Sequence, residues 1–189
     1  MRRFVVALVL PLALVSGCAE GTGTKGYIDG DSVVKEIKPA DRKPVGTVAG
    51  DRLGGGKLDL AGFKGKVVVL NLWWSQCPPC RKEQPMLASA ARKLAAKGVA
   101  VMGINTRDGG QSGPLAYQRA YHVPYPSIYD PDGQTLLAFK AYVSPNSIPS
   151  TLVIDEQGRV AATVLGELPS ETTLLDLVQD AGGPAVSSS

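Results

Sequence analysis

The sequence predicts an α/β fold with a central mixed sheet flanked by helices, and three patterns indicate it. A continuous run of apolar and β-branched residues spans 66–73, which is typical of a strand buried on both faces of a sheet. A helical pattern follows at 78–97, and a second apolar run spans 99–105. Together they predict a βαβ unit with a right-handed crossover. Residues 151–165 predict an antiparallel hairpin, so the sheet contains both strand directions.

The remaining elements follow from local signals. The helix at 78–97 should end at Gly98, because glycine commonly follows the last helical turn. We expect a short helix at 115–121, an extended segment at 127–129 and a helical segment at 134–142, with an Asp-Pro-Asp-Gly turn between the last two. A final helix should begin at the N-cap residue Ser170, since apolar residues follow it at helical positions.

The first 17 residues have the build of a secretory signal peptide. Arg2 and Arg3 precede an apolar stretch at 4–15, which is shorter than the roughly 20 residues that a membrane-spanning helix needs. Val-Ser-Gly-Cys at 15–18 resembles the bacterial lipobox, in which the cysteine receives a lipid and becomes the first mature residue. Lipidation of Cys18 would hold the protein at the extracytoplasmic face of the cell membrane, because two acyl chains give stable anchoring.

Composition suggests the domain limits and excludes one class of partner. Residues 18–43 are rich in Gly, Thr, Asp and Lys, so we expect a lipid-anchored flexible tether there, a folded domain at 44–181 and a disordered tail at 182–189. The formal net charge is +3, and without Arg2 and Arg3 18 basic residues face 17 acidic ones. A nearly neutral chain without a Lys/Arg run has no electrostatic footprint for nucleic acid.

Two cysteines, Cys77 and Cys80, lie where the first buried strand passes into the long helix. A thiolate at a helix N-terminus is stabilised by unpaired backbone N–H groups and by the positive end of the helix dipole. Cys77 precedes the first turn, so we expect it to be the exposed nucleophile. Cys80, one turn further on, is placed to attack the resulting mixed disulfide.

Two other interpretations of the cysteine pair are weaker. A zinc site would need further ligands, and His122 is the only histidine. A permanent structural disulfide over a two-residue spacer would add little stability, because the entropic effect of a disulfide grows with loop length. The pair therefore favours a redox role, and we expect neither a metal nor any cofactor besides the Cys77–Cys80 disulfide.

Residues 68–85, with Trp73-Trp74-Ser75-Gln76-Cys77-Pro78-Pro79-Cys80 at their centre, resemble the active-site segment of the TlpA/ResA-type thioredoxin-like family. The segments 103–105, 142–143 and 147–155 resemble further parts of that family in the same order, so the resemblance covers residues 44–180. It implies a thioredoxin-like fold and thiol-disulfide oxidoreductase activity.

The resemblance also implies roles for three more residues. Pro149 would be a cis-proline that faces the two cysteines, and the backbone of Ile148 would pair with an extended substrate segment. Glu83 falls where members of the family carry an acidic residue near the cysteine pair. Two interpretations of Glu83 are open: a partly buried acid that shuttles protons or tunes the thiol pKa, and a solvated helix residue.

Two positions bear on substrate and proton chemistry. Gln76 stands where the family usually has tryptophan, which leaves the substrate-docking face and the reduction potential open. Thioredoxin has a buried aspartate at the position of Asn71. This chain has asparagine there instead, as other members of this group do. That proton-transfer role is therefore absent or passes to Glu83.

The working hypothesis is a monomeric, membrane-tethered reductant. Its substrates would be disulfides of exported proteins, and the resemblance suggests apocytochrome c among them. A membrane electron-donor protein would reduce the Cys77–Cys80 pair again after each turnover. A disulfide-introducing oxidant and a redox-inert lipoprotein binding module are the alternatives.

Overall fold

The computed structural model describes residues 26–29, 32–144 and 146–188. The predicted signal peptide at 1–17 and the predicted lipidation site Cys18 lie outside these residues. Among the helices of the described ranges, none has both the length and the apolarity that crossing a membrane requires.

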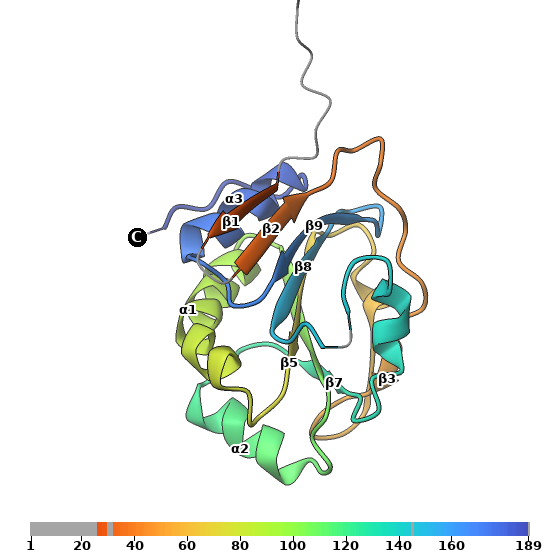
Figure 1. Ribbon diagram of the computed structural model, residues 1–189, viewed down its shortest axis with the longest axis vertical. Helices are drawn as coiled ribbons and strands as arrows, with labels where there is room; N and C mark the ends of the chain where they lie inside the picture. Colours follow the sequence, from red (N-terminus) through yellow and green to blue (C-terminus); the bar gives the residue numbers. More distant parts are fainter. Residues whose placement is uncertain (1–25, 30–31, 145, 189) are drawn as a thin grey trace, which may run out of the picture.

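A seven-stranded mixed sheet forms the centre of the domain (Figure 1). The strand order is β1-β2-β9-β8-β5-β6-β7, where β5, β6 and β7 run parallel and all other neighbours are antiparallel. The strands are β1 (Gly26–Asp29), β2 (Ser32–Glu36), β5 (Val68–Trp73), β6 (Ala100–Asn105), β7 (Ser127–Tyr129), β8 (Ser150–Ile154) and β9 (Val160–Leu165). A separate hairpin pairs β3 (Ala49–Asp51) with β4 (Lys57–Asp59).

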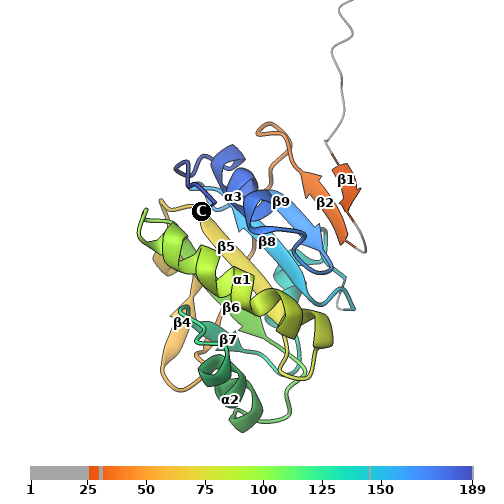
Figure 2. The same cartoon turned by 90° about the vertical axis from the view of Figure 1, so that its left-hand side faces the viewer.

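Helices cover both faces of the sheet. The helices α1 (Pro78–Ala95) and α3 (Glu171–Asp180) lie across one face, as Figure 2 shows, and bury an apolar cluster against it. The 3-10 helices η1 (Leu60–Phe63) and η2 (Thr135–Phe139) pack on the other face. Residues of β5 alternate between the two clusters, since Val69 joins the first and Leu70 the second. This double burial explains the uninterrupted apolar run in the sequence.

Local chemistry sets both ends of α1. Cys77 is the N-cap, and Pro78 and Pro79 occupy the first two helical positions, where an N–H group would have no partner within the helix. After Ala95 the chain reaches Gly98, whose φ of 85° is strained for other residues. The predicted helix is confirmed, and it ends two residues earlier than expected.

The other predicted elements are confirmed with small shifts in their bounds. The helix α2 (Ser112–Ala120) begins three residues before the expected position, and η2 is shorter than the segment expected at 134–142. Ser170 is the N-cap of α3, because its Oγ accepts a hydrogen bond from Thr173 N at 3.0 Å. The thioredoxin-like α/β fold with a central mixed sheet is confirmed by the arrangement of these elements.

The prediction that the folded domain begins at residue 44 is wrong. In the segment expected to be a tether, β2 pairs with β9 over four residues, and Val34 is fully buried. Arg42 donates to Ile37 O and to Asp180 O, at 3.0 Å in each case. The short β2 strand shows little pattern of its own, and the edge of β9 supplies the hydrogen bonds that hold it.

The C-terminal segment also differs from the prediction of a disordered tail. Residues 182–188 have no helix or strand, as expected. However, Gly183 N donates to Val178 O at 2.9 Å, and Val186 packs against the cluster beneath α3. One apolar side chain therefore attaches this segment to the core.

Two adjacent valines of β2 test whether this strand belongs to the folded domain. Val34 is 0% exposed and Val33 is 43% exposed, so they occupy opposite faces of the strand. We expect Val34→Ala to lower the free energy of unfolding by about 2 kcal/mol, because it removes two buried carbon groups. Val33→Ala should change it by less than about 0.5 kcal/mol. Urea denaturation of the oxidised protein measures both, and equal effects would contradict the assignment.

Candidate active site

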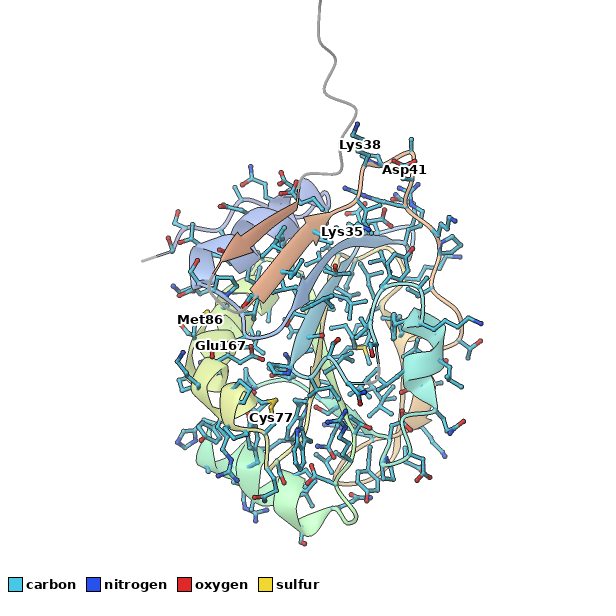
Figure 3. All side chains as sticks on the ribbon, viewed as in Figure 1. Lys35, Lys38, Asp41, Cys77, Met86 and Glu167 are labelled. Atoms are coloured by element: carbon cyan, nitrogen blue, oxygen red, sulfur yellow. A yellow bond between two sulfur atoms is a disulfide. The ribbon has the colours of Figure 1, made fainter. Side chains whose placement is uncertain are left out.

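A disulfide joins Cys77 and Cys80 at the point where β5 passes into α1. The two Cα atoms are 5.2 Å apart, and Cys80 N donates to Cys77 Sγ at 3.1 Å. Cys77 lies at the start of α1, in the opposite half of the molecule from Lys38 and Asp41 (Figure 3). Cys77 is the N-cap of α1, a helix of 18 residues, so its sulfur lies at the helix N-terminus, where negative charge is favoured.

The expectation that Cys77 is exposed is wrong for the disulfide form. Cys77 is 2% exposed and Cys80 is 1% exposed. Both belong to an apolar group, here called the cysteine cluster, with Leu53, Trp73 and Tyr117. The bond to Cys80, which faces the interior from the first turn of α1, holds Cys77 within this cluster. Only reduction frees Cys77 from that bond.

The backbone that leads into Cys77 is anchored by Asp108. Its carboxylate accepts hydrogen bonds from Ser75 N at 2.8 Å, Ser75 Oγ at 2.6 Å and Asn105 Nδ2 at 2.7 Å. Asp108 is 8% exposed, so these bonds are largely shielded from water. Tyr129 Oη donates to the carbonyl of Asp108 at 2.9 Å. The loop after β6 thus fixes the turn that carries the nucleophile.

Trp73, which packs with Cys77 and Cys80 in the cysteine cluster, supports the same turn. Its indole Nε1 donates to Ser127 Oγ of β7 at 3.2 Å, and its ring stacks on Tyr117 with 4.6 Å between centroids. To reach Ser127 the indole crosses Gly103 of β6, where a Cβ atom would lie 2.8 Å from Trp73 Nε1. Only glycine allows this approach, so Gly103 is part of the support of the site.

A buried polar network lies behind Cys80. Tyr117 Oη lies 2.9 Å from Cys80 O and 3.2 Å from Gln84 Oε1, so its single proton is donated to one of these two oxygens. Tyr125 Oη lies 3.1 Å from Gln84 Nε2 and can donate to Gln84 Oε1 at 3.2 Å. Because a carbonyl of the first turn of α1 takes part, the network links α2 and the loop before β7 to the resolving cysteine.

Glu83 is buried, so it is not a solvated helix residue. It is 2% exposed, and its carboxylate accepts hydrogen bonds from Leu168 N at 2.8 Å and Asn71 Nδ2 at 3.0 Å. Burial raises the pKa of Glu83 to about 7, although these two hydrogen bonds act in the opposite direction. The negative charge of Glu167 adds to the rise in pKa. Glu83 is therefore an acid that changes protonation near neutral pH.

Asn71 joins Glu83 to the neighbouring strand. Its Nδ2 also donates to Thr151 Oγ1 of β8 at 3.2 Å, so both of its amide protons are used. Among the described residues, Asn71 Oδ1 has no hydrogen-bond partner, and Asn71 is fully buried. An amide at position 71 places no second ionisable group beside Glu83.

The predicted cis-proline loop lies beside the cysteines. The Ile148–Pro149 bond is cis, and the Ile148 side chain packs against the cysteine cluster. Pro149 O accepts a hydrogen bond from Gly166 N at 3.0 Å, which holds the loop against the end of β9. Ile148 N donates to Asn146 O at 3.1 Å, so pairing of this amide with a substrate requires that contact to open. The substrate-binding role of Ile148 and Pro149 stays a prediction.

Gln76 and Arg81 form the outer edge of the site. Arg81 Nε donates to Ser75 O at 2.8 Å, and Arg81 Nη2 lies 3.5 Å from Gln76 Oε1. Both side chains are exposed. Where the family usually has an aromatic cover, this chain therefore has a polar and cationic edge.

Sequence reasoning missed four residues of the site: Asp108, Tyr117, Gln84 and Tyr125. One signal could have found Asp108, because it follows the run Asn105-Thr106-Arg107 at the carboxyl end of a buried strand. Polar residues gather at such strand ends in α/β folds. No comparable local signal marks Gln84, since a glutamine on a helix is usually exposed.

The geometry supports thiol chemistry. Within the described part of the chain, no group of three or more His, Cys, Asp or Glu side chains could hold a metal ion. The site offers a cysteine sulfur at a helix N-terminus, a second cysteine one turn away and a buried acid with a pKa near neutrality. Such an arrangement can exchange a disulfide and move the accompanying protons.

Comparison with known proteins agrees with this chemistry. The model of the Redoxin family matches residues 38–179. The thiol-disulfide oxidoreductase ResA of Bacillus subtilis is 32% identical over 114 residues, which span 60% of this chain and 61% of that protein. The thiol:disulfide interchange protein DsbE of Pseudomonas fluorescens biotype C is 32% identical over 169 residues, or 88% of this chain and 86% of that protein.

A solved structure of a thiol-disulfide isomerase has a similar fold. The structure of a secreted thiol-disulfide isomerase from Corynebacterium glutamicum matches with a TM-score of 0.73 and 31% sequence identity. The match covers 84% of this chain and 99% of that chain.

The raised pKa of Glu83 predicts a specific dependence of stability on pH. Between pH 4.5 and 7 the folded protein holds a proton on Glu83 that the unfolded chain has lost. Stability therefore falls as the pH rises through this window. Relative to Glu83→Gln, the free energy of unfolding of the wild type should fall by about 3 kcal/mol from pH 4.5 to pH 7.

Urea denaturation of the oxidised proteins over this pH range measures the difference, and the intact disulfide removes thiol titration from the comparison. Glu156→Gln is the matched control, because Glu156 is exposed and its removal should leave the profile parallel to that of the wild type. Parallel profiles for wild type and Glu83→Gln would show that the pKa of Glu83 is the same in the folded and the unfolded protein, and would contradict the prediction.

Proposed function

Because the chain belongs to the Redoxin family and is a thiol-disulfide oxidoreductase of the TlpA/ResA type, we propose that it reduces disulfides of exported proteins through Cys77 and Cys80. The observation that carries the proposal is the position of Cys77 Sγ, which receives the Cys80 N–H at 3.1 Å at the start of α1. A thiolate formed there is stabilised, so Cys77 is ionised more readily and can act as the nucleophile that attacks a client disulfide.

The reaction proceeds in two exchange steps. The Cys77 thiolate attacks one sulfur of the client disulfide, so a Cys77–client bond forms and the other client cysteine leaves as a thiolate. The Cys80 thiolate then attacks Cys77 Sγ and releases the second client cysteine. Two electrons pass to the client, and the Cys77–Cys80 disulfide of the present structure results.

Glu83 is the proposed proton carrier for the second step. Cys80 must lose a proton before it attacks. Glu83 follows Cys80 by three residues on α1, and burial raises its pKa to about 7, close to the pH at which a general base is most effective. Its hydrogen bonds to Leu168 N and Asn71 hold the carboxylate in one position.

The cellular setting is also a proposal. A lipid on Cys18 holds the protein at the extracytoplasmic face of the membrane, where client proteins arrive unfolded and a membrane electron-donor protein restores the dithiol. The protein acts as a monomer, without a metal or added cofactor. Apocytochrome c is the proposed client class, on the basis of the resemblance to the TlpA/ResA-type family. The basic pair, apolar stretch and Val-Ser-Gly-Cys sequence of residues 2–18 support the anchor.

Insulin reduction tests the redox function. With dithiothreitol as the electron source, wild type should accelerate the precipitation of insulin, and Cys77→Ser should return the rate to the uncatalysed level. Cys80→Ser should instead accumulate a mixed disulfide with insulin, because the resolving thiol is absent. Full activity of Cys77→Ser would exclude the mechanism.

The reduction potential distinguishes a reductant from an oxidant. A value near about −270 mV in glutathione redox buffers agrees with the proposal, and one near about −120 mV would identify an oxidant that introduces disulfides.

Substitution of Cys18 tests the membrane anchor. In bacterial cells that express the full chain, wild type should appear in the membrane fraction and incorporate a labelled fatty acid. Cys18→Ser should be unlabelled and should be found outside that fraction, because no thiol remains to receive the lipid. Labelling of Cys18→Ser, or its full retention in the membrane fraction, would contradict the proposed anchor.

A further inference from the structure

The guanidinium of Arg81 is held in a fixed position at the outer edge of the site. Its Nε donates to Ser75 O at 2.8 Å, and its Nη2 lies 3.5 Å from Gln76 Oε1. Ser75 and Gln76 are the two residues directly before Cys77. The positive charge therefore lies over the backbone that leads into the nucleophile, while the side chain remains exposed.

The contacts of Arg81 are with neutral oxygens. Among the described residues, Arg81 takes part in none of the ion pairs. The carboxylate of Asp108 is linked to the same turn, but it is buried and its oxygens accept from Ser75 and Asn105. Glu167 is paired with Lys82 at 2.9 Å. The charge of Arg81 is thus available to a molecule that approaches from solvent.

Two further features make the edge beside Cys77 favourable for a negatively charged group. The first turn of α1 contains no acidic residue that would offset the positive end of its dipole. Gln76 is exposed and carries both a hydrogen-bond donor and an acceptor. The edge beside Cys77 is therefore positive and able to form hydrogen bonds.

We propose that Gln76 and Arg81 form a specificity-determining rim, which favours client proteins that carry an acidic side chain next to the cysteine under attack. The inference rests on the proposed reduction of client disulfides and adds the class of client. When a client sulfur approaches Cys77, its neighbouring residues lie against the rim. A carboxylate there meets the guanidinium, which binds carboxylates with two parallel hydrogen bonds.

Peptide disulfides that differ at one residue test the rim. Three peptides carry Asp, Asn or Lys directly before a single cysteine, which is joined to the neutral leaving group 2-mercaptoethanol. The second-order rate constant for their reduction by the reduced full chain is measured at low and at high salt. Wild type should reduce the Asp peptide about fivefold faster than the Asn peptide, which corresponds to about 1 kcal/mol for an exposed ion pair. The Lys peptide should be slowest, and salt should diminish both differences.

Charge-matched variants identify the source of the preference. Arg81→Gln should bring the Asp/Asn ratio to about one, and Arg81→Lys should retain part of it. Lys97→Gln removes the same charge from an exposed position beyond the far end of α1 and should leave the ratio unchanged. Because each ratio is taken within one variant, a general change in the reactivity of Cys77 cancels.

The outcomes distinguish failure of the proposed rim from failure of the proposed function. If wild type reduces none of the peptides, the proposed function fails and the rim with it. If wild type reduces all three at equal rates, only the rim is wrong. An Asp preference that persists in Arg81→Gln, or an equal fall in all three rates in that variant, would also overturn the rim.

Discussion

The active site depends on how firmly the chain is held between the end of β5 and the start of α1. Asp108 provides most of this support, because it bonds both the backbone and the hydroxyl of Ser75. The carboxylate belongs to the loop after β6, so the parallel pairing of β5 with β6 is what brings it within reach. With this turn fixed, the N-cap position of Cys77, the first turn of α1 and the position of Cys80 follow.

The interior side of α1 has the opposite electrical character to its outer edge. Inside, Glu83 is an acid held among Asn71 and the backbone of Leu168, with a pKa of about 7 because burial disfavours its charge. Outside, Arg81 presents a positive charge to solvent. The proposed proton transfer and the proposed client preference therefore involve opposite sides of α1.

The present structure is the oxidised end of the proposed cycle. Cys77 and Cys80 are covered in this state, and the cysteine cluster surrounds them. Reduction removes the bond that holds Cys77 against the interior. In the oxidised state the N–H of Cys80 already donates to Cys77 Sγ. Tyr117 lies within hydrogen-bond distance of Cys80 O and of Gln84 Oε1, so these side chains pack against the first turn of α1 from the interior.

The sequence alone determined the features that depend on neighbours in the chain. The apolar run in 66–73, the helical pattern in 78–97 and the hydroxyl of Ser170 are local signals, and they predicted β5, α1 and the start of α3. Only the tertiary structure decided the burial of Glu83, because the Leu168 amide that receives it lies 85 residues away. The same holds for Asp108, which is 33 residues from Ser75, and for β2, which becomes a strand by pairing with β9. Burial and pairing of this kind depend on which distant segments pack together, and no local pattern encodes that.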